Sequence, residues 1–417
     1  MAHRSGRAIA LAALRQWRAG NDFADAILAH FLRSSDLGAA DKAFATELFY
    51  GVLRNLTLLD FWIGILRRNY LDLEARDLLR LGIYQLLLLK TPEHAAVYET
   101  VALANARNRS LINAVLRSAV RQLIELETKA NEESLEVRTS HPRFLIERWT
   151  ANFGVENTIA LCQWNNRPPP TFARINHLKI SDQDFLSKYP EAERLRERPN
   201  FVRPTILPSD ALEAGDCYIQ DPSTALASLL LAPQAGDSVL DACAAPGGKT
   251  GYLAELMENR GRILACDRDA NRLRTTEENL GRLGVSIAQF FQHDWRNETQ
   301  LLEFSALVPF DKILVDAPCS NTGVMRRRVD IRWRLTPKDF ARMHEKQLHI
   351  LRATIPFLKP GGILVYSTCS IEPEENEEVV RAVLQKHPFL KLADQLTSLP
   401  FSDGFDGAFA AKLIRAS

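Results

Sequence analysis

Short apolar runs alternate with helical patterns from about residue 218 to the end of the chain. Five of these runs are predicted to be buried strands: Ser238–Ala242, Gly261–Cys266, Ala288–Gln292, Lys312–Val315 and Gly362–Tyr366. Such alternation predicts a doubly wound, mostly parallel α/β sheet of the Rossmann-like kind. Ligands of these sheets bind beyond the carboxyl ends of the strands, so the residues that follow each strand are the candidates for a site.

The preceding residues divide into three further segments. Residues 1–125 are predicted to form an all-helical bundle, because proline is absent before Pro92 and apolar residues recur at spacings of three and four. Residues 126–138 are mostly charged and polar, and they are either a linker or an extension of the last helix. Residues 139–217 mix helix-like and strand-like pieces, with a strand expected within Thr171–Ile180. We therefore expect a small α/β segment before the larger α/β domain, residues 218–417.

Composition limits the partners of the chain. The net charge is +1, from 52 basic and 51 acidic residues, so any binding of nucleic acid must come from local patches. No apolar stretch approaches the roughly 20 residues of a membrane span. Six cysteines without a C-x-x-C pair predict neither structural zinc nor disulfides, and they favour a cytoplasmic protein. Nothing in the sequence requires more than a monomer.

A turn of small residues follows the first predicted strand. It runs Asp241-Ala-Cys-Ala-Ala-Pro-Gly-Gly-Lys-Thr250, and a phosphate-binding P-loop would need glycine where Cys243 stands. Small residues allow a ligand to approach the backbone, and the following helix offers free N–H groups. The turn alone fits either a nucleoside cofactor or a tight turn that needs small residues.

Acidic residues follow the second and third strands. Asp267 is placed to accept hydrogen bonds from ribose hydroxyls, although it could equally cap the helix that begins near Ala270. Asp294 could receive the amino group of an adenine, or it could be a turn residue.

The fourth and fifth strands each lead to a cysteine. The fourth ends in Asp316-Ala-Pro-Cys319, and the fifth in Ser367-Thr-Cys369. A lone buried cysteine is usually a small packing residue, as we expect for Cys243 and Cys266. Two cysteines at matching strand ends instead favour chemistry at that edge.

An arginine-rich segment, residues 325–334, follows the fourth strand. It is predicted to bind an RNA backbone, with a tryptophan that stacks on a base. The alternative is a solvated charged face with the tryptophan in the core. The residues concerned are Arg326, Arg327, Arg328, Arg332, Trp333 and Arg334.

With these motifs, the chain resembles the Sun/Fmu family of bacterial RNA cytosine-C5 methyltransferases. The resemblance rests on three stretches together, residues 241–250, 316–323 and 368–370, and it extends over nearly the whole chain. It implies that S-adenosyl-L-methionine donates the methyl group. The residues implied to bind it are Cys243, Ala244, Ala245, Pro246, Gly247, Gly248 and Lys249, with Asp267 at the ribose, Asp294 at the adenine and Asp316 between cofactor and base.

The resemblance also assigns catalytic roles. A thiolate that adds to C6 of cytosine makes C5 reactive towards a methyl donor. Cys369 is the implied nucleophile, Cys319 the cysteine that assists release, and Asp316 the acid near N3. Lys249 is a source of positive field for the thiolate. The related DNA methyltransferases use the cysteine of a Pro-Cys element, and this leaves Cys319 as the rival nucleophile.

The N-terminal segments fit the same family. Gly82–Leu87, His94–Val97 and Asn113–Arg117 resemble a NusB-like RNA-binding domain, which favours 16S rRNA as substrate. Residues 139–143 and 174–176 resemble a small RRM-like segment, with Arg174 as an RNA contact. Residues 406–411 near the C-terminus carry alanines where the family usually has aromatic residues.

Three alternatives remain open. The enzyme could act on another RNA such as tRNA, or the chain could be an RNA-binding factor with a vestigial methyltransferase fold. A zinc deaminase would need a cysteine where Thr322 stands, three positions after Cys319.

Overall fold

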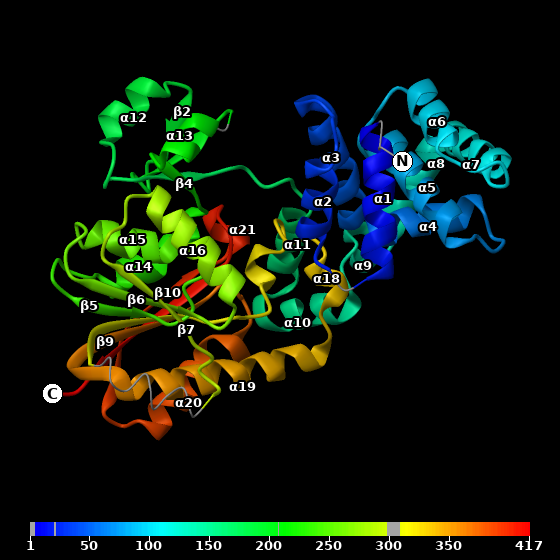
Figure 1. Cartoon of the computed structure of the whole chain (residues 1–417). Helices are drawn as coiled ribbons and strands as arrows, with labels where there is room; N and C mark the ends of the chain where they lie inside the picture. The colour runs from blue at the N-terminus through cyan, green and yellow to red at the C-terminus, as the bar shows by residue number, and fades with distance from the viewer. Residues whose placement is uncertain (1–4, 21, 207, 298–308) are drawn as a thin grey trace. The chain divides into compact units, whose positions relative to one another are not determined.

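The protein, described here as a computed structural model, folds into two compact units (Figure 1). The structure describes residues 5–20, 22–206, 208–297 and 309–417. Unit 1 comprises Met1–Pro168 and Met325–Arg334, and unit 2 comprises Pro169–Val324 and Leu335–Ser417. The chain therefore leaves unit 2 after Val324, contributes ten residues to unit 1, and returns at Leu335.

Unit 1 is helical. Its elements are α1 (Gly6–Ala19), α2 (Ala24–Arg33), α3 (Ala39–Arg54), α4 (Leu56–Leu66), α5 (Leu73–Ile83), the π-helix η1 (Tyr84–Leu88), α6 (Glu93–Ala102), α7 (Arg109–Arg121), α8 (Leu123–Glu132), α9 (Leu135–Thr139), α10 (Arg143–Phe153), α11 (Val155–Asn165) and α18 (Ile331–Arg334). The predicted helical bundle is thereby confirmed.

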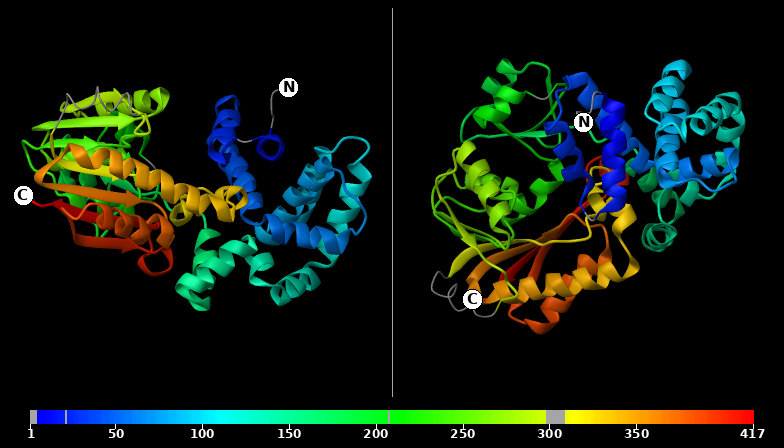
Figure 2. Two further views of the ribbon diagram at one scale, coloured as in Figure 1. Left: turned by 90° about the horizontal axis from the view of Figure 1, so that it is seen from below. Right: turned by 45° about the vertical axis from the view of Figure 1, so that its right-hand side comes forward.

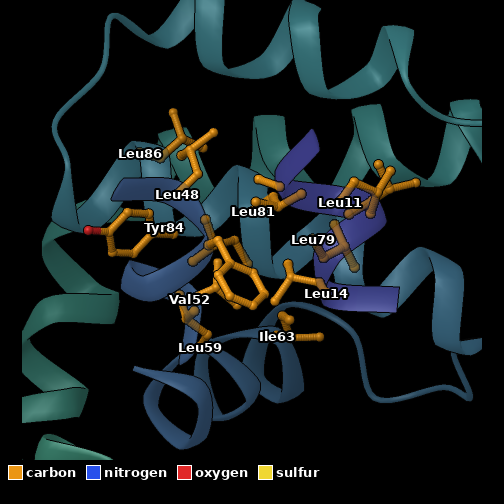
Figure 3. Packing of buried hydrophobic residues seen from close by; sticks show 14 of the residues in the cluster. Leu11, Leu14, Leu48, Val52, Leu59, Ile63, Leu79, Leu81, Tyr84 and Leu86 are labelled. Atoms are coloured by element: carbon orange, nitrogen blue, oxygen red, sulfur yellow. The ribbon is translucent and has the colours of Figure 1, made fainter. Parts of the chain in front are cut away.

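One apolar core holds the bundle together (Figure 3). Leu14, Val52 and Leu79, from three different helices, meet in it with no more than a few per cent of their surface exposed. Burial of each such side chain contributes about 1.5–3 kcal/mol. Gly51 lets α3 approach the ring of Tyr84, since a Cβ at this position would lie 2.0 Å from Cζ of the tyrosine. The bundle is thus built on close helix packing.

Residues 126–138, a linker or a helix extension by sequence, lie in α8 and α9. Leu126 and Ala130 are buried in the same core, so this polar-looking stretch belongs to the bundle. In the described part of the chain no single helix is long and apolar enough to cross a membrane. Only α3 and α4 together reach that length, with a bend of 78° between them.

Unit 2 begins with a small four-stranded sheet of order β2-β3-β1-β4. Its elements are β1 (Ala173–Ile175), α12 (Asp182–Lys188), β2 (Ala192–Arg194), β3 (Phe201–Pro204), α13 (Ser209–Ala214) and β4 (Cys217–Ile219). The strand expected within residues 171–180 is present, although it is only three residues long.

The larger sheet of unit 2 has seven strands in the order β10-β11-β9-β8-β5-β6-β7. They are β5 (Ser238–Asp241), β6 (Arg262–Asp267), β7 (Ala288–Gln292), β8 (Phe310–Asp316), β9 (Leu358–Thr368), β10 (Leu390–Ser398) and β11 (Ala408–Arg415). All five predicted strands are present and pair in parallel. The Rossmann-like fold class is thus confirmed. β11 runs antiparallel between β9 and β10.

Helices cover both faces of this sheet (Figures 1 and 2). The principal ones are α14 (Ala225–Leu231), α15 (Gly248–Leu256) and α16 (Ala270–Arg282) on one face, and α19 (Pro337–Thr354) and α20 (Glu377–Lys386) on the other. Successive residues of a strand point to opposite faces, so Val239 packs with α14 and α15 while Leu240 packs with α19 and α20. β11 lies one strand in from the edge of the sheet, and Ala410 and Ala411 are fully buried on its two faces.

Candidate active site

The carboxyl ends of β8 and β9 lie side by side. Asp316, the last residue of β8, pairs with Ser367 of β9. The Ser367 hydroxyl donates to Oδ1 of Asp316 over 2.6 Å, and the N–H of Ala317 donates to the Ser367 carbonyl over 2.9 Å. The loops that follow the two strands therefore start from one fixed point.

The two loops bring Cys319 and Cys369 together. Their Sγ atoms are 3.3 Å apart. Cys319 is buried, with 7% of its surface exposed, whereas Cys369 is partly exposed. The Cys369 thiol donates to Oδ1 of Asn321 over 3.0 Å, and Nδ2 of Asn321 donates to the Cys319 carbonyl over 3.0 Å. One side chain thus links the nucleophile candidate to the other cysteine's loop.

Lys249 places a positive charge beside this pair. Its Nζ lies 2.6 Å from Oδ2 of Asp316. Burial lowers the pKa of Lys249, but the Asp316 carboxylate and, to a lesser extent, Cys369 and Asp241 act against burial, and the net effect raises that pKa. The Cys369 sulfur is also among the groups that favour the lysine's charge. Lys249 therefore stays an ammonium group at the edge where both cysteines lie.

The surroundings of Cys319 favour its protonated form. The hydrogen bond with Cys369, burial and the charge of Glu375 together raise the pKa of the Cys319 thiol well above its usual value. Burial also raises the pKa of Cys243 and of Cys266. Thiolates are the reactive form of cysteine, so Cys319 is poorly suited to start a nucleophilic attack at neutral pH.

The turn after β5 is fixed from neighbouring elements. The N–H of Ala244 donates to the Cys266 carbonyl over 2.8 Å, while Arg272 and Asn279 of α16 donate to the carbonyls of Ala245 and Pro246, each over 2.9 Å. Gly247 has φ +102°, a value that favours glycine, and it is the N-cap residue of α15. Residues 243–249 thus bring a helix N-terminus to the same edge of the sheet as Asp316.

Asp241 lies behind this turn. Its Oδ2 accepts a hydrogen bond from the Thr250 hydroxyl over 2.7 Å. Burial raises the pKa of Asp241 to about 7, although the hydrogen bond from Thr250 acts against that shift. A buried acid of this kind stays partly protonated at neutral pH.

Asp267 is the last residue of β6, and Asp294 follows the end of β7. The helix cap that the sequence left open for Asp267 belongs to Asp269, whose Oδ1 accepts from the backbone N–H groups of Asn271 and Arg272. Asp267 itself accepts from the N–H of Asp269 over 3.0 Å. Asp294 closes a turn and pairs with Arg296 over 2.6 Å. Hydrogen bonds from Arg296 lower the pKa of Asp294 to about 2.

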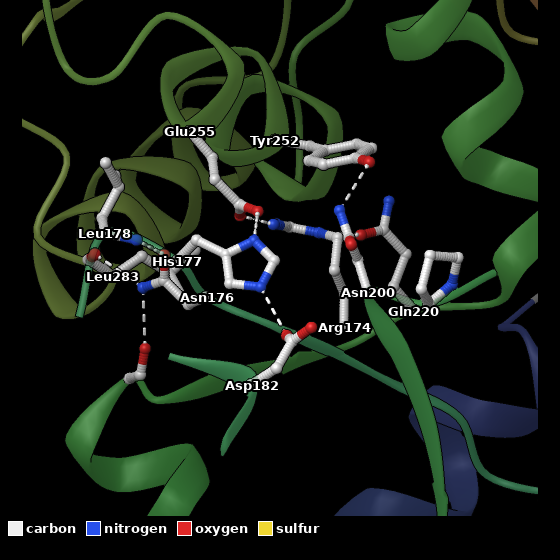
Figure 4. Close-up of polar contacts among 12 residues, drawn as sticks. Arg174, Asn176, His177, Leu178, Asp182, Asn200, Gln220, Tyr252, Glu255 and Leu283 are labelled. Atoms are coloured by element: carbon white, nitrogen blue, oxygen red, sulfur yellow. Dashed lines mark hydrogen bonds and ion pairs between the residues drawn. The ribbon is translucent and has the colours of Figure 1, made fainter. Parts of the chain in front are cut away.

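Arg174 lies inside unit 2, with 1% of its surface exposed (Figure 4). It pairs with Glu255 of α15, donates to Gln220 over 2.9 Å and lies over the Tyr252 ring. His177 then bridges Glu255 and Asp182, at 3.0 Å and 2.6 Å. The sequence predicts Arg174 at RNA, whereas the structure places it in β1 with its side chain against α15.

The arginine-rich segment lies in unit 1. Arg332 has no exposed surface, and its guanidinium donates to Asn166 Oδ1 over 2.7 Å and to backbone carbonyls of Arg54, Ser140 and Asn165. Nε1 of Trp333 donates to the Leu53 carbonyl over 2.9 Å. Proteins satisfy buried charges by such bonds, so these side chains hold the segment to the bundle.

The remaining arginines of the segment differ in exposure. Arg326 is buried and stacks 3.8 Å from the centre of the Trp164 ring, and Arg334 pairs with Asp330 over 2.9 Å. Arg327 is half-buried, and Arg328 is exposed. Arg328 and part of Arg327 are therefore accessible to a phosphate backbone at the surface, whereas Arg332 is inaccessible in this structure.

Sequence reasoning missed two residues of the cysteine site, Asn321 and Glu375. Asn321 stands two positions after Cys319, and Glu375 six positions after Cys369. The only sequence signal for Glu375 is the polar run Pro373-Glu-Glu-Asn376 directly after a strand-end loop. Within the described residues, no group of three or more His, Cys, Asp or Glu side chains is arranged to hold a metal ion.

The sheet order and the strand-end site define a Rossmann-like methyltransferase domain, and comparison with known families narrows this class. The 16S rRNA methyltransferase RsmB/F family matches residues 228–414, the NusB family residues 4–121, and a ferredoxin-like domain of RsmF/B-like methyltransferases residues 141–200.

Relatives match over most of the chain. A probable ribosomal RNA small subunit methyltransferase B of Bacillus subtilis is 35% identical, covering 92% of this chain and 89% of the relative. Ribosomal RNA small subunit methyltransferase B of Escherichia fergusonii is 38% identical, covering 90% of this chain and 91% of the relative. The chain therefore belongs to the RsmB/F family of small-subunit ribosomal RNA methyltransferases, and the resemblance seen in the sequence is confirmed.

Solved structures of other proteins share the fold of this chain. The structure of the protein PH0851 is 26% identical and covers 98% of both chains, with a TM-score of 0.79. A methyltransferase homologue from Pyrococcus horikoshii is 32% identical and covers 67% of this chain and 97% of its own, with a TM-score of 0.59. NSun6 from the same organism, solved with SFG, is 25% identical, and the match covers 66% of this chain and 98% of NSun6, with a TM-score of 0.60.

Proposed function

We propose that the protein transfers a methyl group from S-adenosyl-L-methionine to C5 of a cytosine in 16S rRNA, through a covalent bond between Cys369 and C6 of the base. The observation that carries this proposal is the 3.3 Å separation of the Cys319 and Cys369 sulfurs at the ends of neighbouring parallel strands. The family membership supports the RNA substrate and the methyl transfer.

The residues present fit the methyl donor by their chemistry. Carboxylates at Asp267 and Asp294 suit the hydroxyl and amino groups of an adenosine, and Asp316 suits the positive charge of a sulfonium. The small residues from Cys243 to Gly248, with Lys249, would border it. When bound, the donor supplies an electrophilic methyl group to this edge of the sheet.

The chain's own groups then perform the steps on the base. The Cys369 thiolate forms a bond to C6, and the electrons of the C5–C6 double bond move towards N3, which takes a proton from the Asp316–Lys249 pair. C5 is now nucleophilic and would take the methyl group from the sulfonium, which leaves as a neutral thioether. Water takes the C5 proton, the C5–C6 double bond re-forms, the Cys369–C6 bond breaks with Cys319 assisting this release, and N3 returns its proton to the Asp316–Lys249 pair.

The geometry favours Cys369 over Cys319 as the nucleophile. Cys369 is the more exposed sulfur, and Lys249 is close enough for the two groups to interact electrostatically. Cys319 has a raised pKa and is buried. The assignment of Cys319 as nucleophile would require a buried, protonated thiol to attack first.

The proposed RNA surface lies partly on unit 1. Arg67, Arg68 and Arg76 line a hollow of about 410 Å³ together with Tyr70, whose surface is 88% exposed. Cationic groups beside an exposed aromatic ring suit phosphates and an unstacked base. Arg327 and Arg328 complete the proposed contacts.

The test is methylation of 16S rRNA made in vitro, with methyl-labelled S-adenosyl-L-methionine and nucleoside mass spectrometry. We expect 5-methylcytidine with the wild-type protein and with Cys217→Ala, a control at a buried cysteine of β4, but not with Cys369→Ala. Product on tRNA alone would favour the tRNA alternative. Absence of donor binding by calorimetry would favour the RNA-binding factor, and methylation of a base other than cytosine would overturn the mechanism.

A further inference from the structure

A buried carboxylate lies next to the residues that follow the two cysteines. Glu375 has no exposed surface and ends the short 3₁₀ turn η6 (Pro373–Glu375). Its Oε2 accepts from the backbone N–H of Ser320 over 2.8 Å and from Nε2 of Gln347 over 2.9 Å. Its Oε1 accepts from the Ser370 hydroxyl over 3.0 Å. One carboxylate therefore binds the residue after Cys319 and the residue after Cys369.

Further hydrogen bonds join the same two loops around this carboxylate. The Ser370 hydroxyl lies 3.2 Å from the Ser320 hydroxyl and 3.3 Å from that of Thr322. The N–H of Gly323 donates to the Cys369 carbonyl over 3.0 Å, and a Cβ at Gly323 would lie 2.8 Å from that oxygen. The loops are thus closely packed, and the Glu375 carboxylate lies within their contact.

Gln347 ties the carboxylate to the scaffold. It extends from α19, and its Nε2 also donates to the Pro318 carbonyl over 3.1 Å. Burial raises the pKa of Glu375, while the hydrogen bonds from Ser320, Gln347 and Ser370 oppose this shift. A buried charge is costly unless fully hydrogen-bonded, and an apolar side chain would fill the same space without that cost. The contacts of Glu375 concentrate on the two cysteine loops, which indicates a role there.

We propose, on the basis of the function proposed above, that Glu375 is a positioning residue that fixes Cys319 against Cys369 and thereby gives the two cysteines different roles. Through Ser320 and Ser370 it holds the two sulfurs at their short separation. Its negative charge is also one of the causes of the raised pKa of Cys319. Cys319 then keeps its proton while Cys369 attacks the base. The attack requires only the thiolate of Cys369.

The experiment compares Glu375→Gln with Glu377→Gln in the full chain. Glutamine keeps the size of Glu375 and can still accept from Ser320, but it removes the charge. Glu377 lies two residues on, at the start of α20, and is half-buried, so its variant makes the same charge change away from the cysteines. Each protein is alkylated with iodoacetamide between about pH 6 and about pH 10, and peptide mass spectrometry reports Cys319 and Cys369 separately.

We expect the Cys319 alkylation profile of Glu375→Gln to move to lower pH by about one unit, which is about tenfold faster reaction at a given pH below the midpoint. The Glu377→Gln profile should match wild type. Circular dichroism verifies that each variant is folded. A Cys319 profile that is the same in wild type and Glu375→Gln would overturn the proposal, because a merely structural glutamate would not change thiol ionisation.

Methyl transfer gives the second measurement. Glu375→Ala should lower kcat more than Glu375→Gln and leave KM for RNA within about twofold, since no contact with RNA is removed. An equal loss in both variants with a raised KM would contradict a positioning role. If wild type itself transfers no methyl group, the proposed function fails, whereas the alkylation profiles still decide the role of Glu375.

Discussion

The cysteine loops of unit 2 and the arginine-rich segment 325–334 adjoin each other in the chain, but their side chains serve different ends. Asp316, Cys319 and Cys369 gather where two parallel strands end, and part of their surface is accessible. Arg332 and Trp333 are held by backbone carbonyls inside unit 1. Strand topology thus brings the candidate reactive groups together, while a run of arginines does not by itself predict an exposed binding surface.

The largest expected effect concerns the cysteines at the strand ends. Cys369→Ala should reduce methyl transfer by about 10³-fold or more, because the covalent step is lost. Thermal unfolding should change little, since the side chain is small and partly exposed. A variant that kept a tenth of wild-type activity would show that these strand ends do not carry the chemistry.

The second prediction concerns the buried arginine. Arg332→Ala should lower the free energy of unfolding by about 3 kcal/mol, because several carbonyl oxygens lose their donor and a cavity is left. Differential scanning calorimetry measures this change. Arg328→Ala is the matched control from the exposed part of the segment, with an expected change within about 0.5 kcal/mol. Equal stability of the two variants would remove the distinction between buried and exposed arginines.

For RNA affinity we expect the exposed Arg328 to matter more than the buried Arg332, which is the reverse of their order for stability. Arg328→Ala should weaken RNA binding and reduce its salt dependence, as expected when one phosphate contact is lost. The affinity is measured by fluorescence anisotropy at several salt concentrations. An unchanged salt dependence would exclude Arg328 from the RNA surface.

The charge cluster at Arg174 predicts a pH dependence of stability. The hydrogen bond with Glu255 raises the pKa of His177 to about 9, against burial and with help from Asp182. The imidazolium therefore stabilises the fold fully below about pH 6.5, and this contribution disappears as the pH rises through about 9. The side chain is 34% exposed, so we expect only about 1 kcal/mol. His177→Asn should flatten the pH dependence of the unfolding free energy over this range, and an unchanged slope would contradict the ion pairs.

The smallest expected effect is at Asn321. This residue has φ +60°, so glycine removes its side chain without adding backbone strain. In Asn321→Gly the Cys369 thiol loses its acceptor, and its alkylation at neutral pH should be about fivefold faster. Asn157→Ala, on the exposed surface of α11, is the control. A slower reaction would show that Asn321 assists the thiolate instead.

Sequence patterns predicted the sheet because parallel strands need continuous apolar runs, which are easy to see. They located Cys369 and Lys249 because residues at the ends of such strands share one edge. They could not predict that Arg332 and Arg174 are buried, since burial depends on acceptors such as Asn166 and Glu255 that are distant in sequence. Glu375 was missed for the same reason, because its partners come from three separate segments.

Trapping the covalent intermediate tests the central claim most directly. The wild-type protein is incubated with S-adenosyl-L-methionine and 16S rRNA that contains 5-fluorocytidine, whose C5 fluorine cannot leave as a proton does. The covalent product is then digested and sequenced by mass spectrometry. We predict a methylated fluorocytidine bonded to Cys369. A nucleotide bonded to Cys319, or no covalent product from a preparation that methylates normal RNA, would contradict the mechanism.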